Sequence, residues 1–68
     1  MNEEALNISI RKFLKQFGVG SQREIELAIQ KALDTGRLKG TESIPATATL
    51  RIEALGVEFT TESLITLQ

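Results

Sequence analysis

The side chains that could do chemistry in this 68-residue chain are carboxylates, amines, guanidinium groups and hydroxyls, because histidine and cysteine are absent. Without histidine, no general base has an unperturbed pKa near neutrality, and no serine or threonine has a partner to activate it. Without cysteine, disulfides and thiolate metal sites cannot form. We therefore expect a non-enzymatic protein with no catalytic residue, no metal site and no cofactor.

Two short groups of polar residues are candidate contacts for nucleic acid or for a partner protein. In the first, Arg11 and Lys15 are one helical turn apart, and a like-charge pair at this spacing destabilises a helix by a few tenths of a kcal/mol. The repulsion favours a patch for phosphate or an acidic partner, although a solvated face is the simpler interpretation. The candidates are Arg11, Lys12 and Lys15 in the first group, and Ser21, Gln22 and Arg23 in the second.

The second group lies in the stretch GVGSQREIE, where Ser21 and Glu24 match the capping box that starts a helix. A helix-turn-helix would place Gln22 and Arg23 in the DNA major groove, where they can read adenine and guanine. Bulky Leu14, four residues before the glycine, and the acidic Glu24 do not suit that motif. A capped joint between two helices is therefore favoured, with a weak DNA-binding helix-turn-helix as the alternative.

Helical periodicity predicts two helices, at about residues 3–17 and 22–35. Apolar residues recur at Leu6, Ile10, Phe13, Leu14 and Phe17, and again from Ile25 to Leu33, with offsets typical of one helical face. Asn2 is a suitable N-cap for the first helix and Gly18 a suitable end; Gly36 is a suitable end for the second.

The last third of the chain alternates apolar and polar residues, which predicts strands at about 46–54, 57–61 and 64–67. We expect one α+β domain over residues 1–68, with two N-terminal helices packed on one face of a two- or three-stranded antiparallel β-meander (α-α-β-β(-β)), and a β-hairpin wing in the DNA-binding alternative. Glu53, Glu58 and Glu62 would share the outer face. They suggest a carboxylate metal site only weakly, because a solvated sheet surface is the simpler interpretation.

The totals favour a small cytoplasmic binding or interaction module. Net charge is −1, a weak basis for a nucleic-acid binder, and Phe13, Phe17 and Phe59 all lie on predicted core faces rather than on a stacking platform. No apolar run is long enough for a membrane span, and the N-terminus lacks a signal peptide. An unknown protein partner or a homodimer is expected, since a core of this size is small for one chain. The biological role and the partner's identity do not follow from the sequence.

The segments ISIRKFLK, GVGSQREIE, AIQKAL and GTESIPATATL, taken in this order, resemble a family of small bacterial proteins of unknown function. Together these segments make up half of the chain. The resemblance implies a short domain in which helix precedes strand. It implies no activity, ligand or catalytic residue.

Overall fold

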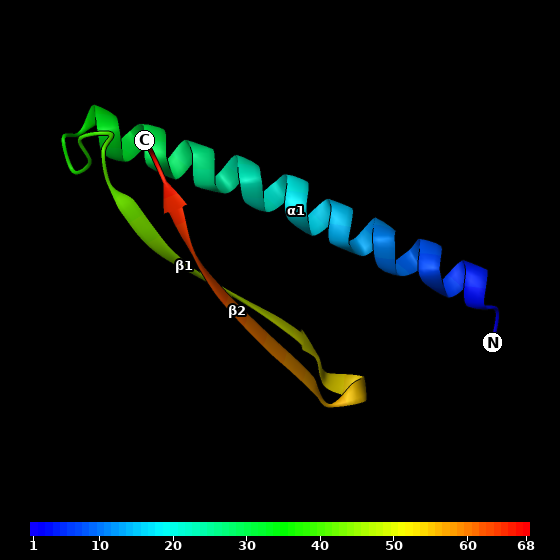
Figure 1. Cartoon of the computed structure of the whole chain (residues 1–68). Coiled ribbons are helices and arrows are strands. Elements are labelled where there is room, and N and C mark those ends of the chain that lie inside the picture. Colours follow the sequence, from blue (N-terminus) through cyan, green and yellow to red (C-terminus); the bar gives the residue numbers. More distant parts are fainter. The chain divides into compact units, whose positions relative to one another are not determined.

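A computed structural model describes all 68 residues as one helix followed by a β-hairpin (Figure 1). Helix α1 spans Glu3–Asp34, strand β1 Ser43–Ile52, the short 3₁₀-helix η1 Glu53–Leu55, and strand β2 Val57–Thr66. The α+β composition is confirmed, but the prediction of two helices is wrong. The chain divides into two compact units, residues 1–37 and residues 38–68, which are described separately below. That the chain forms one domain stays a prediction.

Helix α1 begins as predicted and continues where a break was expected. Asn2 is the N-cap, and its Oδ1 accepts a hydrogen bond of 3.0 Å from the amide of Ala5. Gly18 and Gly20 do not end the helix: neither has a positive φ, the conformation that a helix-ending glycine adopts. Ser21 lies inside the helix, where a continuous hydrogen-bond ladder replaces the expected capping box. Two interior glycines weaken a helix by about 1 kcal/mol each, which 32 residues of otherwise favourable sequence tolerate.

The C-terminus of α1 ends in a Schellman motif. Thr35 is the C-cap and Gly36 follows with φ +79°. The amide of Gly36 donates to the carbonyl of Leu33 at 3.2 Å, and the amide of Arg37 donates to that of Ala32 at 2.8 Å. These two bonds satisfy carbonyls that a helix end leaves without partners. The prediction that Gly36 ends this helix is confirmed.

The second unit is an antiparallel hairpin in which Ser43 pairs with Thr66 and Ile52 pairs with Val57. A bond of 3.0 Å from the amide of Leu67 to the carbonyl of Glu42 extends the ladder by one step. The hairpin turns through η1 and Gly56, which has φ +65°. The third strand is wrong, because 57–61 and 64–67 belong to one strand that passes through residues 61–63 without turning.

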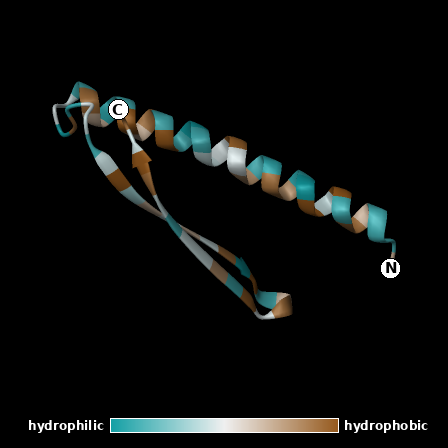
Figure 2. Cartoon of the chain, in the orientation of Figure 1, coloured by the Kyte–Doolittle hydropathy of each residue, from teal (hydrophilic) through white to brown (hydrophobic).

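Neither unit taken by itself buries a side chain, so neither has a core of its own. The two faces of the hairpin still follow the predicted alternation: Ala46, Ala48, Leu50 and Ile52 lie on one face, and Thr47, Thr49 and Arg51 on the other. Apolar segments recur along both units in the hydropathy view (Figure 2). In the hairpin, the residues predicted to be core thus occupy the expected face.

Candidate functional site

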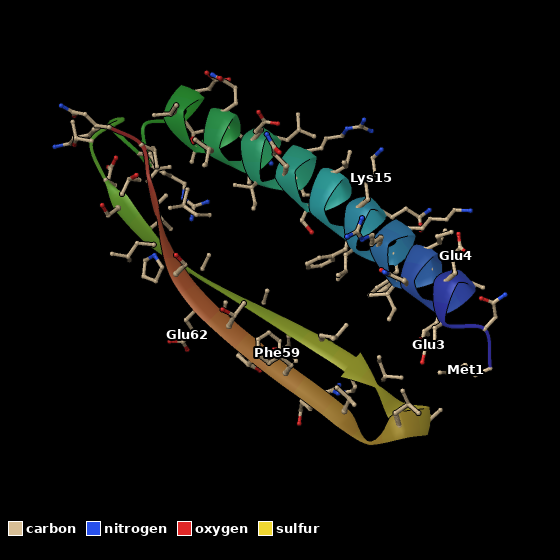
Figure 3. The ribbon with its side chains drawn as sticks, turned by 45° about the vertical axis from the view of Figure 1, so that its right-hand side comes forward. Met1, Glu3, Glu4, Lys15, Phe59 and Glu62 are labelled. Atoms are coloured by element: carbon tan, nitrogen blue, oxygen red, sulfur yellow. The ribbon has the colours of Figure 1, made fainter.

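The strongest concentration of charge lies on one side of α1. No acidic residue occurs between Ala5 and Arg23, and this segment carries Arg11, Lys12, Lys15 and Arg23. At 100° per residue these four cations fall within an arc of roughly 120°. None of them makes an ion pair, since the protein's one salt bridge is in the hairpin. We call these four residues the basic face; Figure 3 shows Lys15 projecting from α1.

A shallow surface depression lies on the basic face, above the position where Gly20 has no side chain. It brings together three of the predicted contact residues, Lys12, Lys15 and Arg23. Arg11 is outside its lining, as are Ser21 and Gln22. The full lining is Lys12, Lys15, Gln16, Val19, Gly20 and Arg23.

The predicted group Ser21, Gln22 and Arg23 does not stand at the start of a helix. All three lie in the middle of α1. The expected helix-turn-helix is therefore absent, and so is the helix start that would have contacted DNA bases. The capping-box pattern was misleading because its residue types also suit a helix interior when the preceding residues stay helical. Ser21 is turned away from Arg23, by roughly 160° around the helix axis.

The opposite side of α1 carries a mostly apolar stripe that continues past Gly18 and Gly20. At 100° per residue its members fall within an arc of roughly 120°. Its six large members are between 39% and 51% exposed. Sequence analysis assigned this stripe to two separate helices. A repeat of 11 residues, from Ile10 to Ser21 and from Phe17 to Ala28, was a signal that the stripe is continuous. The helix stripe consists of Leu6, Ile10, Phe13, Leu14, Phe17, Ser21, Ile25, Ala28 and Ala32, and the charged Glu24 lies in the same arc.

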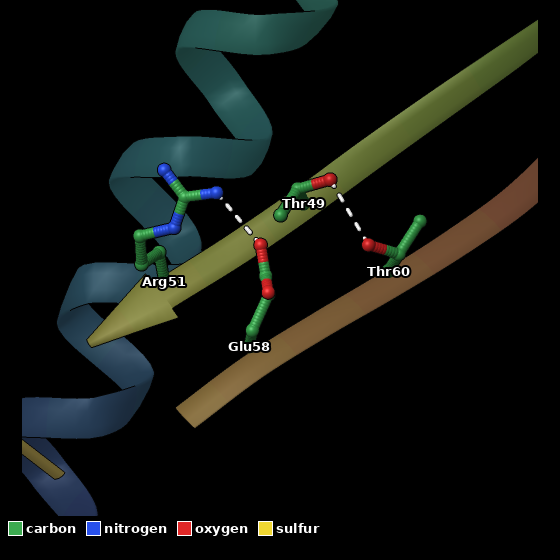
Figure 4. A network of polar contacts seen from close by, with 4 residues as sticks. All are labelled: Thr49, Arg51, Glu58 and Thr60. Carbon is green, nitrogen blue, oxygen red and sulfur yellow. Dashed lines mark hydrogen bonds and ion pairs between the residues drawn. The ribbon is translucent and has the colours of Figure 1, made fainter. Parts of the chain in front are cut away.

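The polar face of the hairpin is held by contacts between its two strands (Figure 4). The Thr49 and Thr60 hydroxyls are 3.0 Å apart, and Arg51 Nη2 donates to Glu58 Oε1 at 2.7 Å. The weak suggestion of a carboxylate site is not supported by this geometry: Glu58 is engaged by Arg51, and no cluster of three potential ligands forms. Figure 3 shows Glu62 and Phe59 on β2, where the register places them on opposite faces.

Glu42 organises the segment before β1. Its carboxylate accepts hydrogen bonds from three successive amides, those of Lys39 at 2.9 Å, Gly40 at 3.0 Å and Thr41 at 3.1 Å. The bond from the Lys39 amide is the main reason that the pKa of Glu42 lies below its usual value, with smaller contributions from the other amides. Sequence analysis did not predict this contact, although Glu42 closely follows Gly40 in the sequence.

These features define a small α+β protein whose notable surfaces are a basic helix face, an apolar helix stripe and an open hairpin. The chain belongs to the Family of unknown function (DUF6494), whose profile it matches over residues 1–68. The resemblance to a family of unknown function is thereby confirmed. No curated protein and no solved structure matches the chain. No helix combines the length and apolar character that crossing a membrane requires.

Proposed function

We propose that this protein is a non-enzymatic interaction module that binds a partner through the helix stripe. The observation that carries the proposal is the stripe itself, from Leu6 to Ala32, which no other residue of the helix unit covers. Contiguous exposed apolar surface on a small protein marks an interaction site more often than scattered single residues do. The lack of histidine and cysteine supports the non-enzymatic part.

The free energy of burying apolar surface supports the same proposal. Burying apolar surface stabilises a protein by about 25 cal/mol per Å². A hairpin of only two strands is marginally stable in water unless another element covers its apolar face. A chain that leaves Ile10, Phe13 and Phe17 about half exposed gains little of this stabilisation alone. Association is the direct way to obtain it.

Photo-crosslinking in the native cell tests the proposal. Phe13 is replaced by a photoreactive phenylalanine, and the matched control places the same group at Lys15, on the basic face. We expect an adduct from position 13 and little from position 15. Irradiation that yields no adduct at position 13 would refute the interaction module.

A second candidate function is contact with an anionic partner through the basic face. It is favoured by the clustering of Lys12, Lys15 and Arg23 around one depression and by the absence of any ion pair there. Cations that contact phosphates release counterions, so affinity falls steeply with salt. Duplex DNA titrated at low and moderate salt should shift the amides of residues 11–23. If no shift occurs even at low salt, this candidate is discarded.

The predicted cytoplasmic location stays a prediction. It is supported by the lack of cysteine in this sequence.

A further inference from the structure

The outer edge of β2 is a continuous row of backbone groups that β1 does not use. In an antiparallel ladder, opposed residues alternate between pairs that exchange backbone hydrogen bonds and pairs that do not. The amide of Leu67 donates to the carbonyl of Glu42, which makes these two residues a bonded pair. Following the register from this pair, the odd-numbered residues of β2 bond to β1, and the even-numbered residues point their amides and carbonyls outward.

Two side-chain contacts agree with this assignment. Side chains approach each other most closely in the pairs without backbone bonds, where the Cα atoms are about 4.5 Å apart. The contacts across the hairpin join Thr49 to Thr60 and Arg51 to Glu58, and both pairs belong to that class (Figure 4). The residues of β2 with outward amides and carbonyls are therefore Glu58, Thr60, Glu62, Leu64 and Thr66.

The outer edge of β1 differs from that of β2 because a proline interrupts it. Pro45 belongs to a pair without backbone bonds, so its ring nitrogen stands at the outer edge where another residue would present a donor. Strand β2 contains neither proline nor glycine in its ten residues. The edge of β2 can therefore accept an added strand along its whole length, whereas the edge of β1 cannot.

The charge along β2 selects the strand that can be added. Its only charged residues, Glu58 and Glu62, are acidic, and both are outward residues of the same face. Glu58 is paired with Arg51, whereas Glu62 makes no ion pair. Opposite charges on directly facing residues of neighbouring strands stabilise a sheet, and like charges destabilise it. A second copy of β2 would bring two more glutamates and no cation, whereas a strand with lysine or arginine is complementary.

The other face of β2 specifies the remaining residues of the added strand. Val57, Phe59 and Ile65 lie on the face opposite Glu62 and continue the apolar face of the hairpin. A strand with cations at alternate positions and β-branched or aromatic residues between them would match both faces. A third strand also stabilises the hairpin itself, because an isolated pair of strands is only marginally stable in water.

We propose that the outer edge of β2 binds an extended segment of a partner protein in antiparallel orientation, with lysine or arginine opposite Glu58 and Glu62. Main-chain hydrogen bonds supply the affinity in this mode of recognition, and the alternate side chains supply the specificity. Antiparallel pairing is the more stable of the two orientations per residue. The inference goes beyond the proposed function, because it concerns a different surface and holds or fails independently of the helix stripe.

Amide hydrogen exchange of the full chain, measured by NMR, is the first test. The probe is a synthetic peptide as long as β2, ten residues, that alternates lysine with valine. We expect slower exchange at the outward amides of β2 and no change at the outward amides of β1, those of Thr47, Thr49 and Arg51. Equal slowing at both edges, or slowing at neither, would overturn the inference. Slow exchange at the outward amides of β2 without peptide would do the same, because the edge would already be covered.

N-methylation of the peptide tests the backbone pairing. In the antiparallel arrangement, lysines opposite Glu58 and Glu62 point their amides toward β2, and the valines point theirs away. Methyl groups on the lysine nitrogens should weaken binding by at least about tenfold, because several hydrogen bonds are lost. Methyl groups on the valine nitrogens leave those bonds intact and are the matched control. Equal binding of the two peptides would rule out main-chain pairing, and the reverse order would rule out the antiparallel orientation.

Charge exchange tests the selection of cations. A peptide with glutamate in place of lysine should bind at least about threefold more weakly. Glu62→Lys should reduce this preference by a similar factor. Glu53→Lys is the matched control, because it changes the net charge equally but lies in η1, outside β2. If Glu53→Lys reduces the preference as much, only a long-range attraction between net charges is present, and the assigned contact is wrong.

Discussion

Arg51 and Glu58 face each other across the hairpin, with 2.7 Å between Nη2 and Oε1 (Figure 4). Their side chains are 62% and 61% exposed. Water therefore screens the attraction, and exposed pairs of this kind contribute roughly 0.2–1 kcal/mol.

The first prediction concerns this pair. A double-mutant cycle with Arg51→Ala and Glu58→Ala should give a coupling free energy of at most about 1 kcal/mol, smaller in high salt. Chemical denaturation followed by circular dichroism measures it. The Thr49→Ala and Thr60→Ala cycle is the control, because its hydroxyl contact carries no charge and its coupling should not depend on salt. A coupling for the charged pair that is unchanged by salt would contradict the prediction.

The second prediction concerns the pH dependence introduced by Glu42. Its pKa is lowered in the folded protein, mainly by the Lys39 amide. The stabilisation is therefore fully present above the unfolded pKa, about 4.3, and is lost as the pH falls through the lower folded value. The amide shifts of Lys39, Gly40 and Thr41 should titrate together with a midpoint below that of an ordinary glutamate.

Glu42→Gln provides the control for that titration. A neutral amide oxygen can still accept from the same amides, but it does not titrate. The three amide shifts should then stay constant through the acid range. If they still move together in the variant, their titration has another origin.

The third prediction concerns the Schellman motif at Gly36. A side chain at φ +79° is strained, so Gly36→Ala should destabilise the helix end by about 1–2 kcal/mol. Gly36→Asn should cost less, because asparagine tolerates the left-handed conformation. Amide exchange at Arg37, which donates to Ala32, reports the change. Equal protection in both variants would argue against this motif.

The fourth prediction concerns the interior glycines. Gly18→Ala and Gly20→Ala should each stabilise helix α1 by about 1 kcal/mol, because alanine has the higher helix propensity and an added Cβ meets nothing within 4 Å at either position. Circular dichroism followed through thermal unfolding measures the change. Asn7→Ala is the control and should stabilise the helix by a smaller amount. A loss of helicity in either glycine variant would contradict the prediction.

Local signals at the ends of elements predicted the fold well, and signals inside α1 did not. Asn2 and Gly36 act as the predicted caps because nothing competes with them. At Gly18 and Ser21, a break competed with continuation of the helix, and the cost of two glycines was smaller than the cost of ending one helix and nucleating another. The residues Thr61–Ser63 resemble a turn by composition, yet they pair with β1 like the rest of β2.

The candidate site was predicted only in part. Lys12, Lys15 and Arg23 line one depression, whereas the sequence analysis had placed them in two separate groups. The DNA-reading geometry failed because it required a helix start at Gln22, and α1 has already made five turns there. The continuous helix stripe was missed because the sequence analysis assigned each half of it to a separate helix.

The hairpin has one further consequence. In a ribbon of two strands, each strand has a free margin whose unpaired backbone groups invite endless lateral stacking of copies. Pro45 removes a donor from β1, and Glu62 places a negative charge on β2. Fibril growth by edge-to-edge pairing of hairpins is thereby opposed.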